Sequence, residues 1–128
     1  MGLDEQEIRR LAGAWVSFHR EPSRAKENSE YFWAWKRLQE LINEDPRGAW
    51  RVIDSIRHLD TCSDQVLGSL GAGPLEDLLA RHGSDFIEQV ENLARQDPQF
   101  RRLLGVVWQN KIPDDLWRRI KAVADPSW

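Results

Sequence analysis

The sequence contains a single cysteine, Cys62, among its 128 residues. One cysteine cannot form an intramolecular disulfide, and it excludes the zinc sites that are built on paired cysteines. The three histidines, His19, His58 and His82, lie far apart and form no HxxxH, HExxH or ExxH pattern. We therefore expect no bound metal and no cofactor.

Long apolar runs are also absent. No run approaches the ~20 residues that a membrane-spanning helix needs, and the first residues, Met1 to Glu5, are polar and acidic. These features predict neither a signal peptide nor a membrane contact, so a cytoplasmic location is the default expectation.

The chain lacks an excess of positive charge. Its formal net charge is −3, divided as −2 over residues 1–64 and −1 over residues 65–128. A protein that neutralises a phosphate backbone usually needs a basic surface, which makes nucleic acid an unlikely partner. A weak nucleic-acid binder stays open as an alternative only through one local basic group, formed by Arg101, Arg102, Arg118, Arg119 and Lys121.

No segment alternates polar and apolar residues as a strand does, whereas apolar residues recur at helical spacing almost everywhere. The expected fold is all-α: a compact bundle or a short stack of antiparallel helical hairpins with about seven or eight helices. We expect a single domain over residues 1–128, with an N-terminal helix at 1–20, a linker at 21–29, a hairpin core at 30–124 and a tail at 125–128. The predicted helices are 4–19, 29–44, 46–59, 63–70, 74–82, 85–96, 98–109 and 112–124.

Two Asp-Pro pairs, Asp45-Pro46 and Asp97-Pro98, lie 52 residues apart. Aspartate is a favoured N-cap and proline suits the first helical position, so each pair predicts a corner at which a new helix begins. Apolar positions on either side match at the same offset, which is typical of a hairpin repeat. A common cap used twice explains the same pattern.

Tryptophan is abundant, with seven residues against one tyrosine and four phenylalanines. Trp15 and Trp35 fall on apolar stripes and are expected in the core, with Trp50 at its edge. Other tryptophans point away from these stripes, where either a second helical layer or a partner covers them. Tryptophan and arginine are enriched at binding hot spots, and the candidate interaction surface is therefore Trp33, Arg37, Trp108 and Trp117.

Glycine and proline are concentrated in one stretch, Gly71-Ala72-Gly73-Pro74, which predicts a break between two helices. Gly83 after His82 suits a helix C-cap. A phosphate site at this corner is disfavoured, because Glu76 and Asp77 in the next helical turn repel an anion.

Several segments together resemble a family of small bacterial proteins known only as a domain of unknown function. The resemblance runs from about residue 30 to about residue 122 and rests on the segments FWAW (32–35), LGAGPLEDLL (70–79), HG (82–83), VW (107–108) and PDDLW (113–117). It implies a bacterial, all-helical protein and carries no activity. It also implies a characteristic patch of residues, which is either structural or a binding site: Gly71, Gly73, Pro74, Glu76, Asp77 and His82.

The absence of catalytic patterns and the surplus of tryptophan favour a non-enzymatic module that binds another protein. One specific version is an immunity-like or defence-related inhibitor, and a homodimer stays open. The alternative is a small enzyme or ligand-binding domain at the corner between Gly71 and His82, with side chains converging on a pocket.

Overall fold

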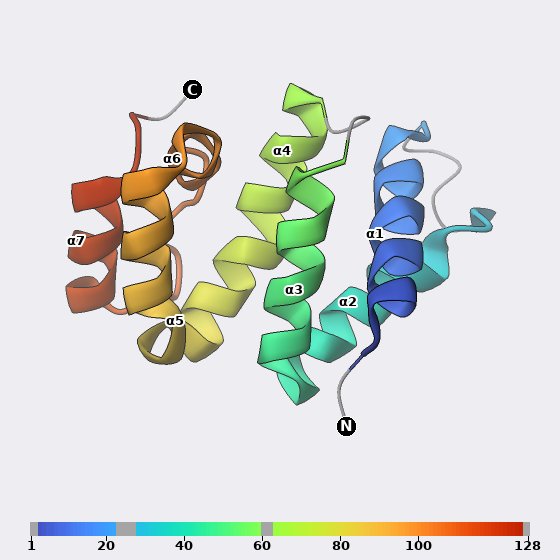
Figure 1. The fold of residues 1–128 in the computed structure, drawn as a ribbon, viewed down its shortest axis with the longest axis horizontal. Coiled ribbons are helices and arrows are strands. Elements are labelled where there is room, and N and C mark those ends of the chain that lie inside the picture. The colour runs from blue at the N-terminus through green and yellow to red at the C-terminus, as the bar shows by residue number, and fades with distance from the viewer. Residues whose placement is uncertain (1–2, 23–27, 60–62, 127–128) are drawn as a thin grey trace. The chain divides into compact units, whose positions relative to one another are not determined.

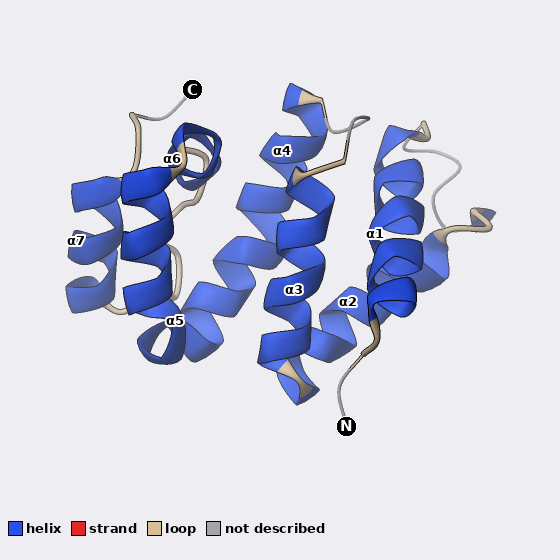
Figure 2. Cartoon of the chain, viewed as in Figure 1, coloured by secondary structure: helices blue, strands red, loops and turns tan. Residues whose placement is uncertain are grey.

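The computed structural model describes residues 3–22, 28–59 and 63–126. Within these stretches every regular element is a helix and none is a strand, so the all-α prediction is confirmed (Figure 1, Figure 2). The helices group into two compact units, residues 1–69 and residues 70–128. The single domain over the whole chain stays a prediction.

The first unit is built on α1 (Glu5–Arg20), α2 (Phe32–Glu44) and α3 (Pro46–Arg57), each of which packs against the other two. The short helix α4 begins at Asp64 and ends at Leu70. The apolar stripes that the sequence predicts supply the interior of this unit. Its fully buried side chains include Trp15, Leu38, Leu41, Ile53 and Ile56.

The second unit contains α5 (Glu76–Gln96), α6 (Pro98–Leu104) and α7 (Asp114–Val123). The long helix α5 packs against both α6 and α7. Its core combines aliphatic side chains with two aromatic rings, Phe86 on α5 and Phe100 at the start of α6. The buried side chains include Leu78, Leu79, Val90, Phe100 and Leu103.

The predicted break at the glycine-rich stretch is wrong. A π-helical segment, η2 (Gly71–Leu75), joins α4 to α5, so helical residues run from Asp64 to Gln96 without interruption. The described residues therefore contain six helices rather than seven or eight. A π-turn is wider than an α-turn, and this suits Pro74, which has no N–H and whose ring would clash in a tighter turn.

The predicted helix boundary at His82-Gly83 is confirmed as a kink rather than as a capped end. His82 has non-helical backbone angles (φ −134°, ψ 18°), and two helical stretches meet there within α5. No described glycine has a positive φ, so Gly83 is not a left-handed cap. A Cβ on Gly83 would lie 2.9 Å from Cδ1 of Leu116, so this glycine allows α7 to approach α5 closely. The helix that begins at Pro98 ends at Leu104, five residues earlier than the sequence predicts.

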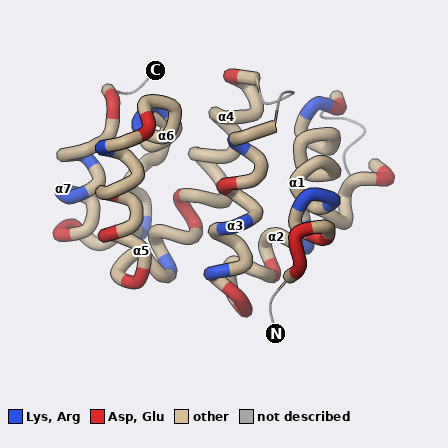
Figure 3. Tube along the Cα trace, viewed as in Figure 1, with Lys and Arg blue, Asp and Glu red and all other residues tan. Residues whose placement is uncertain are grey.

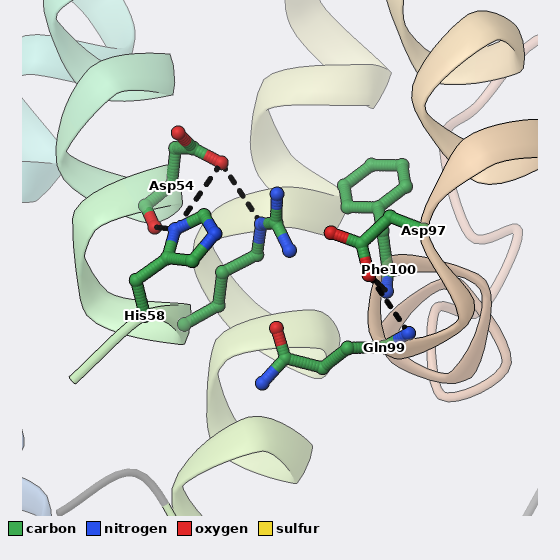
Figure 4. Close-up of polar contacts among 6 residues, drawn as sticks. Asp54, His58, Asp97, Gln99 and Phe100 are labelled. Carbon is green, nitrogen blue, oxygen red and sulfur yellow. Dashed lines mark hydrogen bonds and ion pairs between the residues drawn. The ribbon is translucent and has the colours of Figure 1, made fainter. Parts of the chain in front are cut away.

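Both aspartate caps are confirmed. Asp45 Oδ1 accepts the N–H of Gly48 at 3.1 Å at the start of α3. Asp97 Oδ1 accepts the N–H of Gln99 at 3.0 Å and that of Phe100 at 3.4 Å at the start of α6 (Figure 4). The two corners share one chemistry, and whether they descend from a repeat stays a prediction.

Charged residues are spread along the helices of both units (Figure 3). In α1 an acidic first turn with Glu5 and Glu7 is followed by Arg9 and Arg10. Acidic side chains at a helix N-terminus are favourable because they lie at the positive end of the helix dipole. In the part of the chain that the structure describes, no helix is both long and apolar enough to cross a membrane.

The Asp45 cap predicts a measurable loss of stability on substitution. Asp45→Ala leaves the N–H of Gly48 without its acceptor, and we expect the free energy of unfolding to fall by about 1 kcal/mol. Asp45→Asn keeps an oxygen at this position and should retain most of the stability. Urea denaturation followed by circular dichroism measures both. Equal stability of Asp45→Ala and the unmodified chain would show that the cap contributes nothing.

Candidate functional site

The first three residues of the predicted patch have different structural roles. A Cβ on Gly71 would overlap Cγ2 of Val106 and lie 2.9 Å from the backbone oxygen of Leu103. Gly71 therefore lets η2 touch the end of α6 and the turn after it. Pro74 is buried, whereas a Cβ on Gly73 would meet nothing within 4 Å. Gly71 and Pro74 serve the packing of the second unit, and Gly73 does not.

Glu76, the first residue of α5, holds a distant loop. Its Oε1 accepts the backbone N–H of Trp108 at 3.1 Å, and its Oε2 accepts the side-chain amide of Asn110 at 2.7 Å. Asn110 has φ 39°, a left-handed conformation that asparagine tolerates better than most residues. Both carboxylate oxygens are thus engaged by the same loop, between α6 and α7.

The same loop is fixed from its other side. The side-chain amide of Gln109 donates to the backbone oxygen of Ile112 at 3.2 Å and to Asp114 Oδ1 at 2.6 Å. The N–H of Ile112 donates to the backbone oxygen of Gln109 at 2.7 Å, and the Ile112 side chain is buried. These hydrogen bonds restrict the conformations that the loop can adopt.

Trp108 is carried by this constrained loop, and 68% of its surface is exposed. Among the described residues, the other large hydrophobic side chains that are exposed, Trp33 and Trp35, reach only 39% and 38%. The expectation that Trp108 lies off the apolar core is therefore met. Its backbone N–H is bound to Glu76 while its indole faces solvent.

A pocket of about 650 Å³ opens beside Glu76. Its walls also include Asp77, Arg81, Asn110 and Lys111. Burial raises the pKa of the Asp77 carboxyl above its ordinary value, and the positive charge of Arg81 opposes this shift. The structure thus brings together Glu76 and Asp77, as the patch predicts. His82 is not among the residues that line this pocket.

Trp117, the third candidate tryptophan, is half-buried on α7. Lys121 lies one turn further along with its Nζ 5.6 Å from the centre of the ring. Nearby, Arg119 forms a double hydrogen bond with Glu91 on α5 at 2.9 and 2.6 Å. This hydrogen bond lowers the pKa of Glu91. The contacts tie α7 to α5 and leave Trp117 less available than Trp108.

Part of the basic group around α6 is engaged within the protein. Arg101 donates to the backbone oxygen of Ala94 at 2.7 Å and pairs with Asp125 at 3.8 Å. Arg119 is paired to Glu91 and Lys121 lies over Trp117, so at least three of the five basic side chains proposed for nucleic acid have contacts within the protein. The remaining charge is small for a phosphate backbone.

The first unit carries its own exposed tryptophan, Trp33, at the start of α2. The guanidinium carbon of Arg10, on α1, lies 4.8 Å from the centre of the Trp33 ring. Arg37 instead pairs with Glu40 on the same helix at 3.7 Å, between two exposed side chains. Of the four candidate surface residues, Trp33 and Trp108 are thus exposed anchors, one in each unit.

Trp35 corrects the prediction of a core residue. It is 38% exposed and stacks on Phe32 at 5.6 Å between ring centres. The buried positions at this end of α2 are Ala34 and Leu38 instead. Helical spacing identifies the face of a helix that points inward, but the packing of neighbouring helices determines how much of that face is buried.

Trp15 is fully buried as predicted, and Trp50 is half-buried.

Sequence reasoning missed a polar cluster at the end of α3. Arg57 is buried, and its Nε donates to Asp54 Oδ1 at 2.9 Å (Figure 4). His58 Nδ1 lies 2.8 Å from the backbone oxygen of Asp54. The i, i+3 spacing of Asp54 and Arg57 predicts an ion pair, but nothing in the local sequence predicts that Arg57 is buried.

Cys62, near His58 in sequence, lies outside the described residues, as does Trp128.

Metal ligands do not gather in the described ranges 3–22, 28–59 and 63–126, where no group of three His, Cys, Asp or Glu could hold an ion. The polar side chains that do converge, Glu76, Asp77, Arg81 and Lys111, have mixed charge. Such a set favours contacts with a polar surface or ligand.

The comparisons with known proteins place the chain in a family. Residues 21–127 match the model of a family of unknown function, DUF6869, and the chain belongs to this family. The match covers α2 to α7 and begins just after α1. No curated protein and no solved structure matches the chain.

Gly71 and Gly73 provide a matched pair for testing the packing role of the patch. Gly71→Ala forces a Cβ into Leu103 and Val106, and we expect the free energy of unfolding to fall by roughly 1–3 kcal/mol. Gly73→Ala adds the same atom in open space and should change stability by much less. Thermal unfolding compares the two variants. A similar loss for both would contradict the close approach at Gly71.

Glu76 predicts local order in the loop that it holds. Glu76→Ala removes the acceptor of the Trp108 N–H and of the Asn110 amide, so the loop should open more often. We expect faster hydrogen–deuterium exchange over residues 106–110 and little change in the cores of α5 and α7. Asp77→Ala, which removes the neighbouring carboxylate, is the control. Unchanged exchange in Glu76→Ala would mean that the loop is ordered without Glu76.

Proposed function

We propose that this protein is a non-enzymatic interaction module that binds a partner protein through Trp108. The observation that carries the proposal is the exposure of this indole on a loop that Glu76 holds in place. Burying a large apolar side chain against a partner removes it from water, and this favours binding. Because its backbone is already ordered, little conformational entropy is lost on binding.

The surroundings of Trp108 support the same function. Protein interfaces typically combine a buried aromatic anchor with a polar rim. Here the Trp108 backbone is tied to Glu76, which lines a pocket together with Asp77, Arg81 and Lys111. These side chains supply charges of both signs that can pair with a partner and select against wrong ones.

The partner that we propose is another protein in the bacterial cytoplasm. A specific version is a toxin or phage component, which would make the module an immunity-like or defence-related inhibitor. A second copy of the chain is the other way to cover Trp108. Each version places the indole at the centre of a contact.

A small enzyme at the same corner has weaker support. General acid–base catalysis needs groups within reach of one reacting atom. Both oxygens of Glu76 are used by the loop, and His82 does not line the pocket that contains Glu76 and Asp77. The pocket therefore favours recognition over catalysis.

The test is affinity capture from a lysate of the source organism, with the tagged chain as bait. We expect the bait to capture one protein in stoichiometric amount. Trp108→Ala should reduce the captured amount at least about tenfold, since a hot-spot residue contributes more than about 1.4 kcal/mol to binding. Trp35→Ala, also an exposed tryptophan, is the matched control and should retain the partner. Failure to capture any protein, or equal capture by Trp108→Ala, would refute the proposal.

A further inference from the structure

A groove runs along α1 in the first unit, and none of its lining residues belongs to the loop of Trp108. It has a volume of about 540 Å³ and lies between α1 and the residues that lead into α2. Arg9 and Arg10 come from α1, and Tyr31 and Trp33 form part of the opposite side. We propose that this groove is a docking site for an acidic peptide segment of a partner protein.

Small residues leave room for such a segment. Gly13 and Ser17, one turn apart on α1, line the groove. A Cβ on Gly13 would meet nothing within 4 Å, so the space above it is open. Glycine within a helix is unfavourable for stability, and its presence here is explained if a partner backbone approaches α1 at this point.

The charge of the groove indicates which occupant it fits. Some other arginines of this unit have carboxylate partners: Arg51 pairs with Glu5 at 3.0 Å, and Arg37 with Glu40 at 3.7 Å. Arg9 and Arg10 are exposed, and none of the carboxylates in the described residues forms an ion pair with either. Two unpaired guanidinium groups at one groove are complementary to Asp or Glu side chains.

Trp33 adds an apolar contact beside these charges. The guanidinium carbon of Arg10 lies 4.8 Å from the centre of its ring, and a guanidinium on an aromatic face keeps N–H donors that can bind a carboxylate. Trp33 and Tyr31 offer ring surface to an apolar side chain between the acidic ones. The groove therefore fits a segment in which acidic and apolar residues alternate or follow each other.

A nucleic-acid strand fits less well. Glu30 also lines the groove and would repel successive phosphates. The net charge of the chain is −3, and two unpaired arginines give little of the continuous positive surface that a phosphate backbone requires. A peptide with only a few carboxylates can place them at Arg9 and Arg10 and avoid Glu30.

A random peptide library displayed on phage tests the proposal with the full chain as bait. We expect the selected peptides to be enriched in Asp and Glu together with an aromatic or aliphatic residue. The strongest binder is then synthesised with a fluorescent label, and its Kd is measured by fluorescence anisotropy. A version with Lys in place of every acidic residue and an oligothymidylate serve as comparison probes.

Three variants assign binding to the groove. Arg10→Gln should lower the affinity for the acidic peptide about tenfold. This variant loses one charge-assisted contact to the peptide and the guanidinium that lies over Trp33. Gly13→Leu fills the groove with a side chain that the protein itself accommodates, so affinity should fall while the thermal midpoint stays at or above that of the unmodified chain. Gly68→Leu is the matched control, since Gly68 is also helical with nothing within 4 Å of a Cβ.

The outcomes separate this site from the one around Trp108. Trp108→Ala should leave the peptide affinity unchanged. Selection of basic or neutral peptides, no selection at all, or equal affinity of Arg10→Gln and the unmodified chain would overturn the proposal. Tighter binding of oligothymidylate than of the selected peptide would also overturn it and assign the groove to nucleic acid.

Discussion

The carboxylate of Glu76 is the contact on which the candidate interaction surface depends. One oxygen fixes the backbone at Trp108 and the other fixes the side chain of Asn110, which adopts a left-handed conformation. An exposed indole on a mobile loop would lose conformational freedom on binding. With its backbone N–H bound to Glu76, Trp108 loses less conformational freedom when a partner covers its indole.

Glu76 is in turn positioned by the unusual segment that precedes it. The π-turn η2 holds one more residue per turn than an α-helix, so it rotates the side chains that follow by about 100°. Gly71 allows this segment to touch Leu103 and Val106, close to where the loop begins. The segment LGAGPLED (70–77) thus combines a close helix contact, a widened turn and a carboxylate aimed at the loop. This accounts for Gly71, Pro74 and Glu76 of the patch without a bound ligand.

Features with a local cause could be read from the sequence, and features with a distant cause could not. Asp45 and Asp97 were predictable caps because an N-cap bonds to residues two or three positions away. Gly71 to Pro74 carry the local signals of a break, yet the helical residues are continuous there and Gly71 packs closely against Leu103 and Val106. Glu76 contacts a backbone 32 residues further along the chain, for which the sequence holds no local signal.

The tryptophans show the same limit. Periodicity predicts Trp15 in the core and Trp33 and Trp108 off the apolar stripes, and the structure buries the first and exposes the other two. Trp35 was misplaced, because periodicity indicates the inward face of α2 but not how far its neighbours extend over it. The protein therefore has two surfaces with exposed tryptophan, one in each compact unit, with different chemistry around them.

The central claim is that Trp108 is an exposed side chain on an ordered backbone, and ¹⁵N relaxation of the Trp108 backbone amide tests it most directly. The account predicts an order parameter close to that of the flanking helices, about 0.85. A value below about 0.6 would show a flexible loop, and it would contradict the view that Glu76 presents a preformed binding surface.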